Sequence, residues 1–122
     1  MRKLFLLLLL TTGFNLSAQD TAGFKHAKAE LSEALNTKGI HNVVDNKSAI
    51  IKDSLTAVSV AEPILFSIYG KEHIMGERPY EIYHIDNYWV LSGTLTEDFK
   101  GGTFLIIIDD RDSKVIRITH GK

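Results

Sequence analysis

Residues 80–95 read YEIYHIDNYWVLSGTL, and residues 103–119 read TFLIIIDDRDSKVIRIT. Apolar and polar residues alternate through much of both segments, which is the period of a β-strand with one buried face. The dipeptide Asp86–Asn87 tolerates positive φ and therefore suits a tight hairpin turn. We predict an antiparallel meander of four strands, at Tyr80–Ile85, Tyr88–Leu95, Thr103–Asp109 and Lys114–Thr119.

The third of these strands differs from the second. In the second, Trp89 and Leu91 share one face and the alternation is clear, whereas residues 104–108 read FLIII and are apolar on both faces. An antiparallel sheet covered on one side should alternate, so an unbroken apolar run indicates cover on both sides. Either the sheet curls on itself at this strand, or the second face contacts another protein. A homodimer and a bound partner would satisfy that face equally well.

The chain before the strands has the period of helices. Apolar residues recur at helical spacing between residues 24 and 35, which predicts an amphipathic helix that ends at Gly39. Asp53 has the character of an N-cap for a second helix that ends at Gly70, and Pro63 inside it predicts a kink over the three residues before it. Helices followed by a run of strands predict an α+β fold with the helices on one face of the sheet.

Residues 1–19 have the layout of a cleavable signal peptide. Two cations are followed by the apolar run LFLLLLL at residues 4–10 and then by small and polar residues. The run falls well short of the ~18–20 residues that a membrane-spanning helix needs. We therefore expect cleavage between Ala18 and Asp20, export to the periplasm or the extracellular space without a stable membrane anchor, and a single domain over residues 20–122.

Charge and cysteine content exclude several classes of partner and of stabilisation. Without its first 19 residues the chain has 12 basic and 15 acidic residues, a net charge of −3, and no basic block remains. Nucleic acid and anionic membranes are therefore poor candidates as partners. The absence of cysteine rules out a disulfide framework and a lipid anchor on a cysteine, so the core alone must hold the domain together.

Signals for catalysis or for a cofactor are weak. The sequence has no cysteine nucleophile, no G-x-S-x-G turn and no glycine-rich loop that opens a helix. The acidic segment 109–112 lacks the glycine and the distant glutamate of a calcium loop, so we interpret it as a solvated turn. The histidines are scattered without ligand spacing, and we predict no metal site, no cofactor and no catalytic residues. These histidines are His26, His41, His73, His84 and His120.

Two polar segments remain as candidates for partner binding or for a pocket. Pro79 favours an extended backbone at Arg78, which would display Glu77 and Arg78, although a local ion pair between these two is the alternative. At the other segment, His120 ends a strand and would either close over the open end of a curved sheet or belong to a frayed tail. Tyrosine and tryptophan add aromatic surface with polar tips. The candidate residues are Glu77, Arg78, Tyr80, Tyr69, Trp89, His120 and Lys122.

Several landmarks in order resemble one known family. They are residues 61–65 (AEPIL), 68–72 (IYGKE), 77–80 (ERPY), 89–95 (WVLSGTL), Gly101–Gly102, Asp109 and the closing residues 119–122 (THGK). Together they make residues 53–122 similar to the bacterial immunity proteins with a fold like nuclear transport factor 2. The resemblance implies a cone-like α+β fold with a strongly curved sheet around helices. It also implies a role in neutralising a toxin delivered by a neighbouring bacterium.

Three functions are consistent with these features. We expect a non-catalytic binding protein that occludes a toxin, because a catalytic constellation is missing and one strand is apolar on both faces. The second is a small-molecule pocket or an enzyme in which Asp109 or His120 transfers a proton between apolar walls. The third is an envelope accessory protein that forms a homodimer through the face of its sheet.

Overall fold

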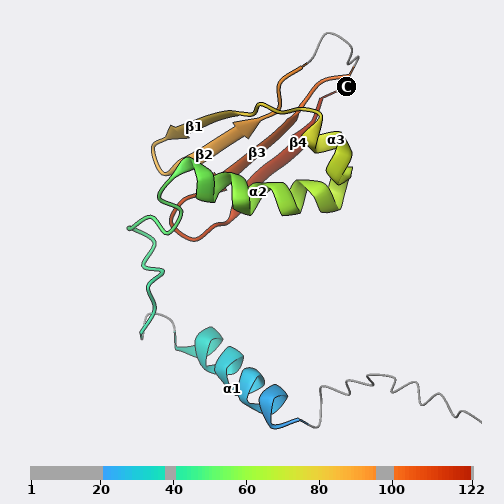
Figure 1. Ribbon diagram of the computed structural model, residues 1–122. Helices are drawn as coiled ribbons and strands as arrows, with labels where there is room; N and C mark the ends of the chain where they lie inside the picture. The colour runs from blue at the N-terminus through green and yellow to red at the C-terminus, as the bar shows by residue number, and fades with distance from the viewer. Residues whose placement is uncertain (1–20, 38–40, 96–100, 122) are drawn as a thin grey trace, which may run out of the picture. The chain divides into compact units, whose positions relative to one another are not determined.

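The computed structural model describes residues 21–37, 41–95 and 101–121 (Figure 1). The chain divides into two compact units, residues 1–40 and residues 41–122, and each is described by itself. The predicted signal peptide lies outside the described residues, and the single domain expected over residues 20–122 stays a prediction. Among the described residues, no helix combines the length and the apolar character needed to cross a membrane.

The first unit contains the helix α1, Ala22–Asn36, which confirms the helix predicted there. Thr21 caps its start, because the side-chain oxygen accepts the Phe24 N–H at 3.1 Å. The helix ends earlier than predicted, at the C-cap Thr37, whose hydroxyl and N–H both donate to the carbonyl oxygen of Glu33. The expected terminator, Gly39, lies outside the described residues.

The second unit begins its regular structure with α2, Ser54–Tyr69, and both ends are where the sequence predicts them. The Asp53 carboxylate accepts the Thr56 N–H at 2.8 Å, which is the bond expected of an N-cap. Gly70 ends the helix with φ of 94°, a conformation that favours glycine. The helix continues through Pro63, and the kink stays a prediction. A short helix that the sequence did not predict, α3, follows directly at Lys71–Met75.

Four strands then form one antiparallel sheet in the order β1-β2-β3-β4, which confirms the predicted meander and the α+β class. Asp86 opens the β1–β2 turn with φ of 53°, as its sequence suggested. The sheet is open rather than closed, with β1 and β4 at its edges. The strands are β1, Glu81–Ile85; β2, Tyr88–Ser92; β3, Phe104–Asp109; and β4, Val115–His120.

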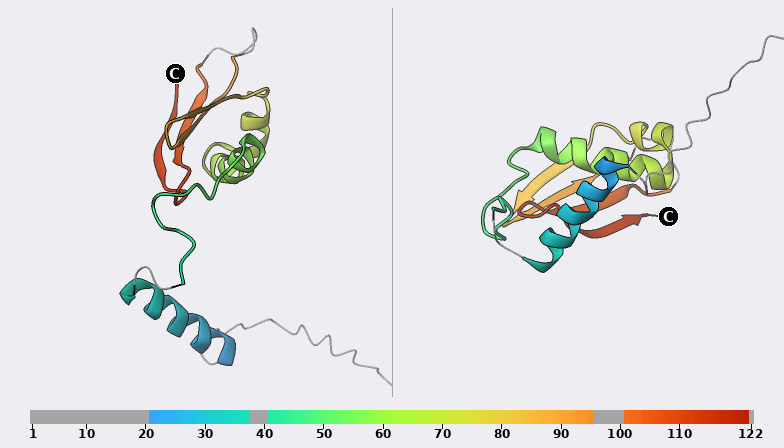
Figure 2. Two further views of the ribbon diagram at one scale, coloured as in Figure 1. Left: turned by 90° about the vertical axis from the view of Figure 1, so that its left-hand side faces the viewer. Right: turned by 90° about the horizontal axis from the view of Figure 1, so that it is seen from below.

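The core lies between the sheet and the two helices of this unit, which cover one face of it (Figure 2). Ala57 and Ala61 on α2 are fully buried, and their small side chains let the helix approach the sheet closely. Each large apolar side chain that becomes fully buried here contributes about 1.5–3 kcal/mol. The large side chains of the core are Ile51, Leu65, Ile74, Trp89, Leu91, Phe104, Ile106 and Ile108.

The other face of β3 is only partly covered among the described residues of this unit. Phe104, Ile106 and Ile108 are buried under the helices, but Leu105 and Ile107 on the opposite face are only half-buried. The helices of the second unit lie on one side only, and among the described residues of this unit no element completes the burial of that second face. The apolar run therefore marks a surface that this unit leaves half open.

Candidate functional site

Two clusters of polar side chains lie at the two ends of the sheet. We call the first the α3 end, where α3 lies beside the last residues of β4 (Figure 1). We call the second the hairpin end, where the β1–β2 and β3–β4 turns lie. The α3 end contains Tyr69, His73, Glu77 and His120, and the hairpin end contains His84, Trp89, Asp109, Asp110 and Arg111.

Glu77 is the centre of the α3 end, and it is buried rather than displayed, with 3% of its surface exposed. A buried carboxylate needs hydrogen bonds. Its Oε1 accepts the backbone N–H of Phe104 at 2.8 Å, and its own carbonyl oxygen accepts the N–H of Thr94 at 2.8 Å. Gly93 provides the space, because a Cβ there would lie 2.7 Å from both Cβ and Oε1 of Glu77.

The second oxygen of Glu77 faces two imidazole rings. Oε2 lies 3.2 Å from Nε2 of His120 and 3.8 Å from Nε2 of His73, and these two nitrogens are 3.3 Å apart. Nδ1 of His120 is 2.9 Å from the carbonyl oxygen of Gly121. The ring of Tyr69 packs against that of His120 with centroids 5.1 Å apart. The tail is therefore not frayed at His120, which closes over this end of the sheet as one of the two predictions stated.

Two glycines place the end of β4 at this site. A Cβ on Gly102, which has φ of 54°, would lie 2.5 Å from backbone atoms of Gly121. Only glycine permits this approach, which is accompanied by a hydrogen bond from the Gly121 N–H to the carbonyl oxygen of Thr103 at 3.0 Å. The chain is thus held firmly on both sides of His120.

The α3 end is chemically a cluster of metal-ligand atoms and proton acceptors. One atom from each of His73, Glu77 and His120 can be chosen so that all three lie within 4.8 Å of one another. Glu77 and His120 were candidate residues from the sequence, whereas His73 was counted among the scattered histidines and no metal site was predicted. The spacing of His73 and Glu77, four residues apart near the end of a helix, was the local signal for this pair.

Arg78 and Tyr80 form a separate cluster with Glu62 of α2, which the sequence analysis did not single out. Arg78 Nη2 and the Tyr80 hydroxyl donate to the same Glu62 oxygen at 2.5 and 2.6 Å, so Arg78 pairs with Glu62 and not, as in the alternative, with Glu77. Burial, together with the bond to Glu62, raises the pKa of Tyr80 to about 12. Burial alone would raise the pKa of Glu62, but the bonds from Tyr80 and Arg78 outweigh it and lower that pKa. This cluster fastens the loop before β1 to α2.

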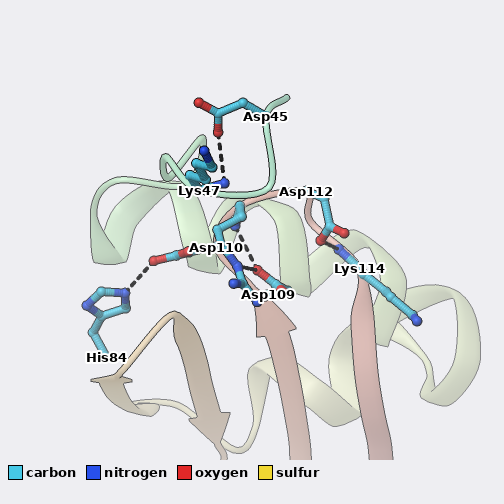
Figure 3. Close-up of polar contacts among 8 residues, drawn as sticks. Asp45, Lys47, His84, Asp109, Asp110, Asp112 and Lys114 are labelled. Carbon is cyan, nitrogen blue, oxygen red and sulfur yellow. Dashed lines mark hydrogen bonds and ion pairs between the residues drawn. The ribbon is translucent and has the colours of Figure 1, made fainter. Parts of the chain in front are cut away.

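At the hairpin end, Trp89 serves the core. Trp89 is 7% exposed, and its Nε1 donates to the carbonyl oxygen of Ile51 at 2.9 Å. The ring of His84 packs on Trp89 with centroids 4.5 Å apart, and its Nε2 lies 2.7 Å from Oδ2 of Asp110 (Figure 3). Trp89 is therefore far from the other candidate residues in the sequence prediction, at the opposite end of β2.

The acidic tip after β3 is not the solvated turn that the sequence suggested, because Asp109 and Asp110 are buried. Arg111 donates to both oxygens of Asp109, at 3.0 and 2.8 Å, which lowers the pKa of Asp109 to about 2. The carbonyl oxygen of Asp110 accepts the N–H groups of both Ile50 and Ile51. Its side-chain Oδ1 is buried without a hydrogen-bond partner among the described residues. These contacts anchor the segment before α2 to the hairpin.

The structure thus divides the seven candidate residues among three places. Tyr69, Glu77 and His120 come together, Arg78 and Tyr80 lie in the neighbouring cluster, and Trp89 is at the hairpin end. Lys122 lies outside the described residues. That any of them contacts a partner protein stays a prediction.

Comparison with known proteins identifies relatives over the same part of the chain. The model of a family described as NTF2 fold immunity protein, where NTF2 is nuclear transport factor 2, matches residues 56–122. The uncharacterized protein YhhH of Escherichia coli (strain K12) is 34% identical over 74 residues, which cover 60% of this chain and 58% of YhhH. The uncharacterized protein YbbC of the same organism is 30% identical over 73 residues, 59% of this chain and 60% of YbbC. The chain thus spans about three fifths of the length of these relatives, and no solved structure matches it.

Proposed function

The chain belongs to the family of NTF2 fold immunity proteins, and from this premise we propose that it is an exported protein that neutralises a protein toxin by direct binding. We further propose that the toxin contacts the outer face of the sheet, the face opposite α2 and α3. The observation that carries this choice is the half-open apolar surface on β3. The residues that define the outer face are Tyr83, Val90, Ser92, Leu105, Ile107, Arg117 and Thr119.

The register of the strands puts a row of contact residues across this face. Tyr83, Val90, Ile107 and Arg117 are neighbours on successive strands, one from each of β1 to β4. Tyr83 is 54% exposed, Val90 and Ile107 are half-buried, and Arg117 is exposed. An aromatic ring, aliphatic side chains and an arginine in one patch match the composition of interface centres.

Asp109 does not fit the enzymatic alternative. A general base at Asp109 would have to accept a proton near neutral pH. Arg111 donates hydrogen bonds to both oxygens of Asp109 and lowers the pKa of Asp109 to about 2. This carboxylate is therefore a weak proton acceptor. We therefore propose that the contacts of Asp109 are structural and that the protein acts by occluding its toxin.

Growth rescue tests the proposal. The full-length gene is co-expressed with each toxin candidate encoded beside it, and the wild-type protein is expected to restore growth against one of them. Tyr83→Arg places a charge in the row of contact residues, on the edge strand β1, and should abolish the rescue. Leu55→Arg makes the same change on α2, where Leu55 is 76% exposed, and should rescue like the wild type.

Each outcome bears on a different part of the proposal. Failure of the wild-type protein against every neighbouring toxin candidate contradicts the immunity role. Equal rescue by Tyr83→Arg and Leu55→Arg places the toxin contact elsewhere. A stable homodimer in solution that Tyr83→Arg dissociates would show that a second copy of this chain occupies the outer face, as in the accessory-protein alternative.

Export is tested separately. We propose that residues 1–19 are removed, so that the protein recovered from the cell envelope should start between Ala18 and Asp20 when its N-terminus is sequenced. Deletion of residues 2–19 should abolish protection while the protein accumulates in the cytosol. Recovery of a protective cytosolic protein with its first 19 residues intact is the result that rules out export.

A further inference from the structure

We propose that His73, Glu77 and His120 bind a zinc ion at the α3 end of the sheet. The ligand atoms would be Nε2 of each histidine and Oε2 of the glutamate. This inference concerns a site separate from the outer face, and it does not depend on the proposed toxin binding.

The distances among the three atoms match those around a tetrahedral metal. Ligand atoms that lie about 2.0–2.2 Å from a tetrahedral zinc ion are about 3.3–3.6 Å from one another. The three distances here are 3.2, 3.3 and 3.8 Å. Small side-chain adjustments would therefore bring all three atoms to bonding distance of one ion.

The hydrogen bond of His120 favours the tautomer that a metal ligand requires. The carbonyl oxygen of Gly121 can only accept, so Nδ1 of His120 carries the hydrogen and donates to it at 2.9 Å. In the neutral ring, Nε2 then presents a lone pair to Glu77 and His73. One proton can join two of these three atoms well, whereas a divalent cation attracts all three. A backbone carbonyl that orients a ligating histidine in this way is a common outer partner in zinc sites.

The surroundings hold the ligands in place before any ion binds. Oε1 of Glu77 is held by the Phe104 N–H, and Gly93 leaves the space that the glutamate fills. The ring of Tyr69 packs on His120. His73, in contrast, is exposed, which gives an ion a route to the site from solvent. Two buried or half-buried ligands and one exposed ligand describe a site that is preformed and accessible.

Zinc is the metal that this ligand set fits best. Two imidazoles and one carboxylate are common zinc ligands, and such sets also accept other late first-row ions such as cobalt and nickel. Calcium and magnesium prefer more oxygen ligands than this cluster offers. The ion would join α3 to the end of β4, two elements about 47 residues apart in sequence, and should stabilise their contact.

Metal titration of the full-length protein, produced without a histidine tag and stripped with a chelator, tests the site. One zinc ion per chain is expected by calorimetry, with a rise in the midpoint of thermal unfolding. Cobalt should give the intense visible absorption of a tetrahedral complex. His73→Gln, at an exposed position, should leave the fold intact and weaken zinc binding at least about tenfold.

His84→Gln is the matched control. His84 is also a half-exposed histidine beside a buried carboxylate, at 2.7 Å from Asp110, but it lies at the hairpin end. This variant should bind zinc like the wild type. The proposal is overturned if the wild-type protein binds no zinc, or if His73→Gln and His84→Gln bind it equally. In either case the cluster is only a hydrogen-bond network, and the toxin-binding proposal is unaffected.

Discussion

The two ends of the sheet contain the same pair of groups in different surroundings. At the α3 end His120 lies 3.2 Å from Glu77, and at the hairpin end His84 lies 2.7 Å from Asp110. Both carboxylates are almost completely buried. The difference is in the rest of each cluster, because Glu77 has a second histidine at one oxygen and a backbone N–H at the other.

Asp110 instead has one side-chain oxygen without a partner among the described residues, and its backbone carbonyl oxygen accepts two N–H groups. A histidine beside a buried carboxylate is therefore not by itself evidence of a site. The α3 end differs in two ways. Nε2 of His73 lies near the same glutamate oxygen as Nε2 of His120, and both oxygens of Glu77 have a polar partner. The hairpin end holds two segments of chain together, whereas the α3 end also presents ligand atoms to solvent.

The largest expected effect comes from removing each carboxylate in turn. Glu77→Ala leaves the buried Phe104 N–H without an acceptor and removes the partner of two histidines, so it should lower the free energy of unfolding by about 3 kcal/mol. Asp110→Ala removes a side chain that has an unsatisfied oxygen and keeps the backbone bonds of Asp110. It should cost only about 1 kcal/mol.

Urea denaturation of both variants measures this difference. Glu77→Gln serves as the control, because its amide oxygen can still accept the Phe104 N–H and most of the stability should return. If Asp110→Ala destabilises the protein as much as Glu77→Ala, the two ends are equivalent and the contrast between them is wrong.

The next prediction concerns the space that Gly93 leaves for the side chain of Glu77. Gly93→Ala places a Cβ 2.7 Å from the Glu77 side chain, and the resulting overpacking should cost about 2 kcal/mol. The cost should fall in part in the double variant with Glu77→Ala, because the clash with Oε1 is gone whereas the clash with Cβ of residue 77 remains. Thermal or urea unfolding of the two single variants and the double variant measures the coupling.

Gly23→Ala is the matched control for Gly93→Ala. Beyond its own helix, no atom of the described residues lies within 4 Å of the added Cβ there, so this substitution should be neutral or slightly stabilising in its helix. Additive effects of Gly93→Ala and Glu77→Ala would contradict the close fit between the glycine and the carboxylate.

The sequence predicts those features of the fold that depend on neighbours in the chain. Asp53 and Gly70 fix the ends of α2 locally, and the alternation in β1 and β2 fixes their buried faces. The helix α3 was missed because five residues are too few for a periodic pattern. Its boundaries depend on Gly70 and Gly76 rather than on an apolar stripe.

The site was only half predictable, because its partners are far apart in sequence. His73 and Glu77 are one helical turn apart and could have been paired, but His120 joins them from 47 residues away. The burial of Glu77 depends on Gly93, 16 positions later, whereas the neighbouring Pro79 had led to the prediction that Glu77 is exposed. The prediction of a solvated turn over residues 109–112 was wrong for the same reason. Asp110 is buried by contacts with Ile50 and Ile51, which precede α2.

The smallest expected effect is an acid dependence specific to the hairpin end. Arg111 lowers the pKa of Asp109 from 3.8 to about 2 through hydrogen bonds and charge. A lowered pKa in the folded state stabilises the fold above pH 3.8, and that contribution is lost as the pH falls through about 2. Arg111→Met should return the pKa of Asp109 toward its ordinary value, so the variant should lose less stability than the parent between pH 4 and pH 2.

Urea unfolding at several pH values across that window measures this difference in lost stability. The Arg111–Asp109 ion pair is partly exposed, so added salt should make the difference smaller. Arg117→Met removes the same charge from an exposed position on β4 and should follow the parent. The α3 end has no such arginine–carboxylate pair among the described residues around Glu77. If the parent and Arg111→Met lose the same stability, the ion pair between Arg111 and Asp109 does not contribute to the acid dependence of the hairpin end.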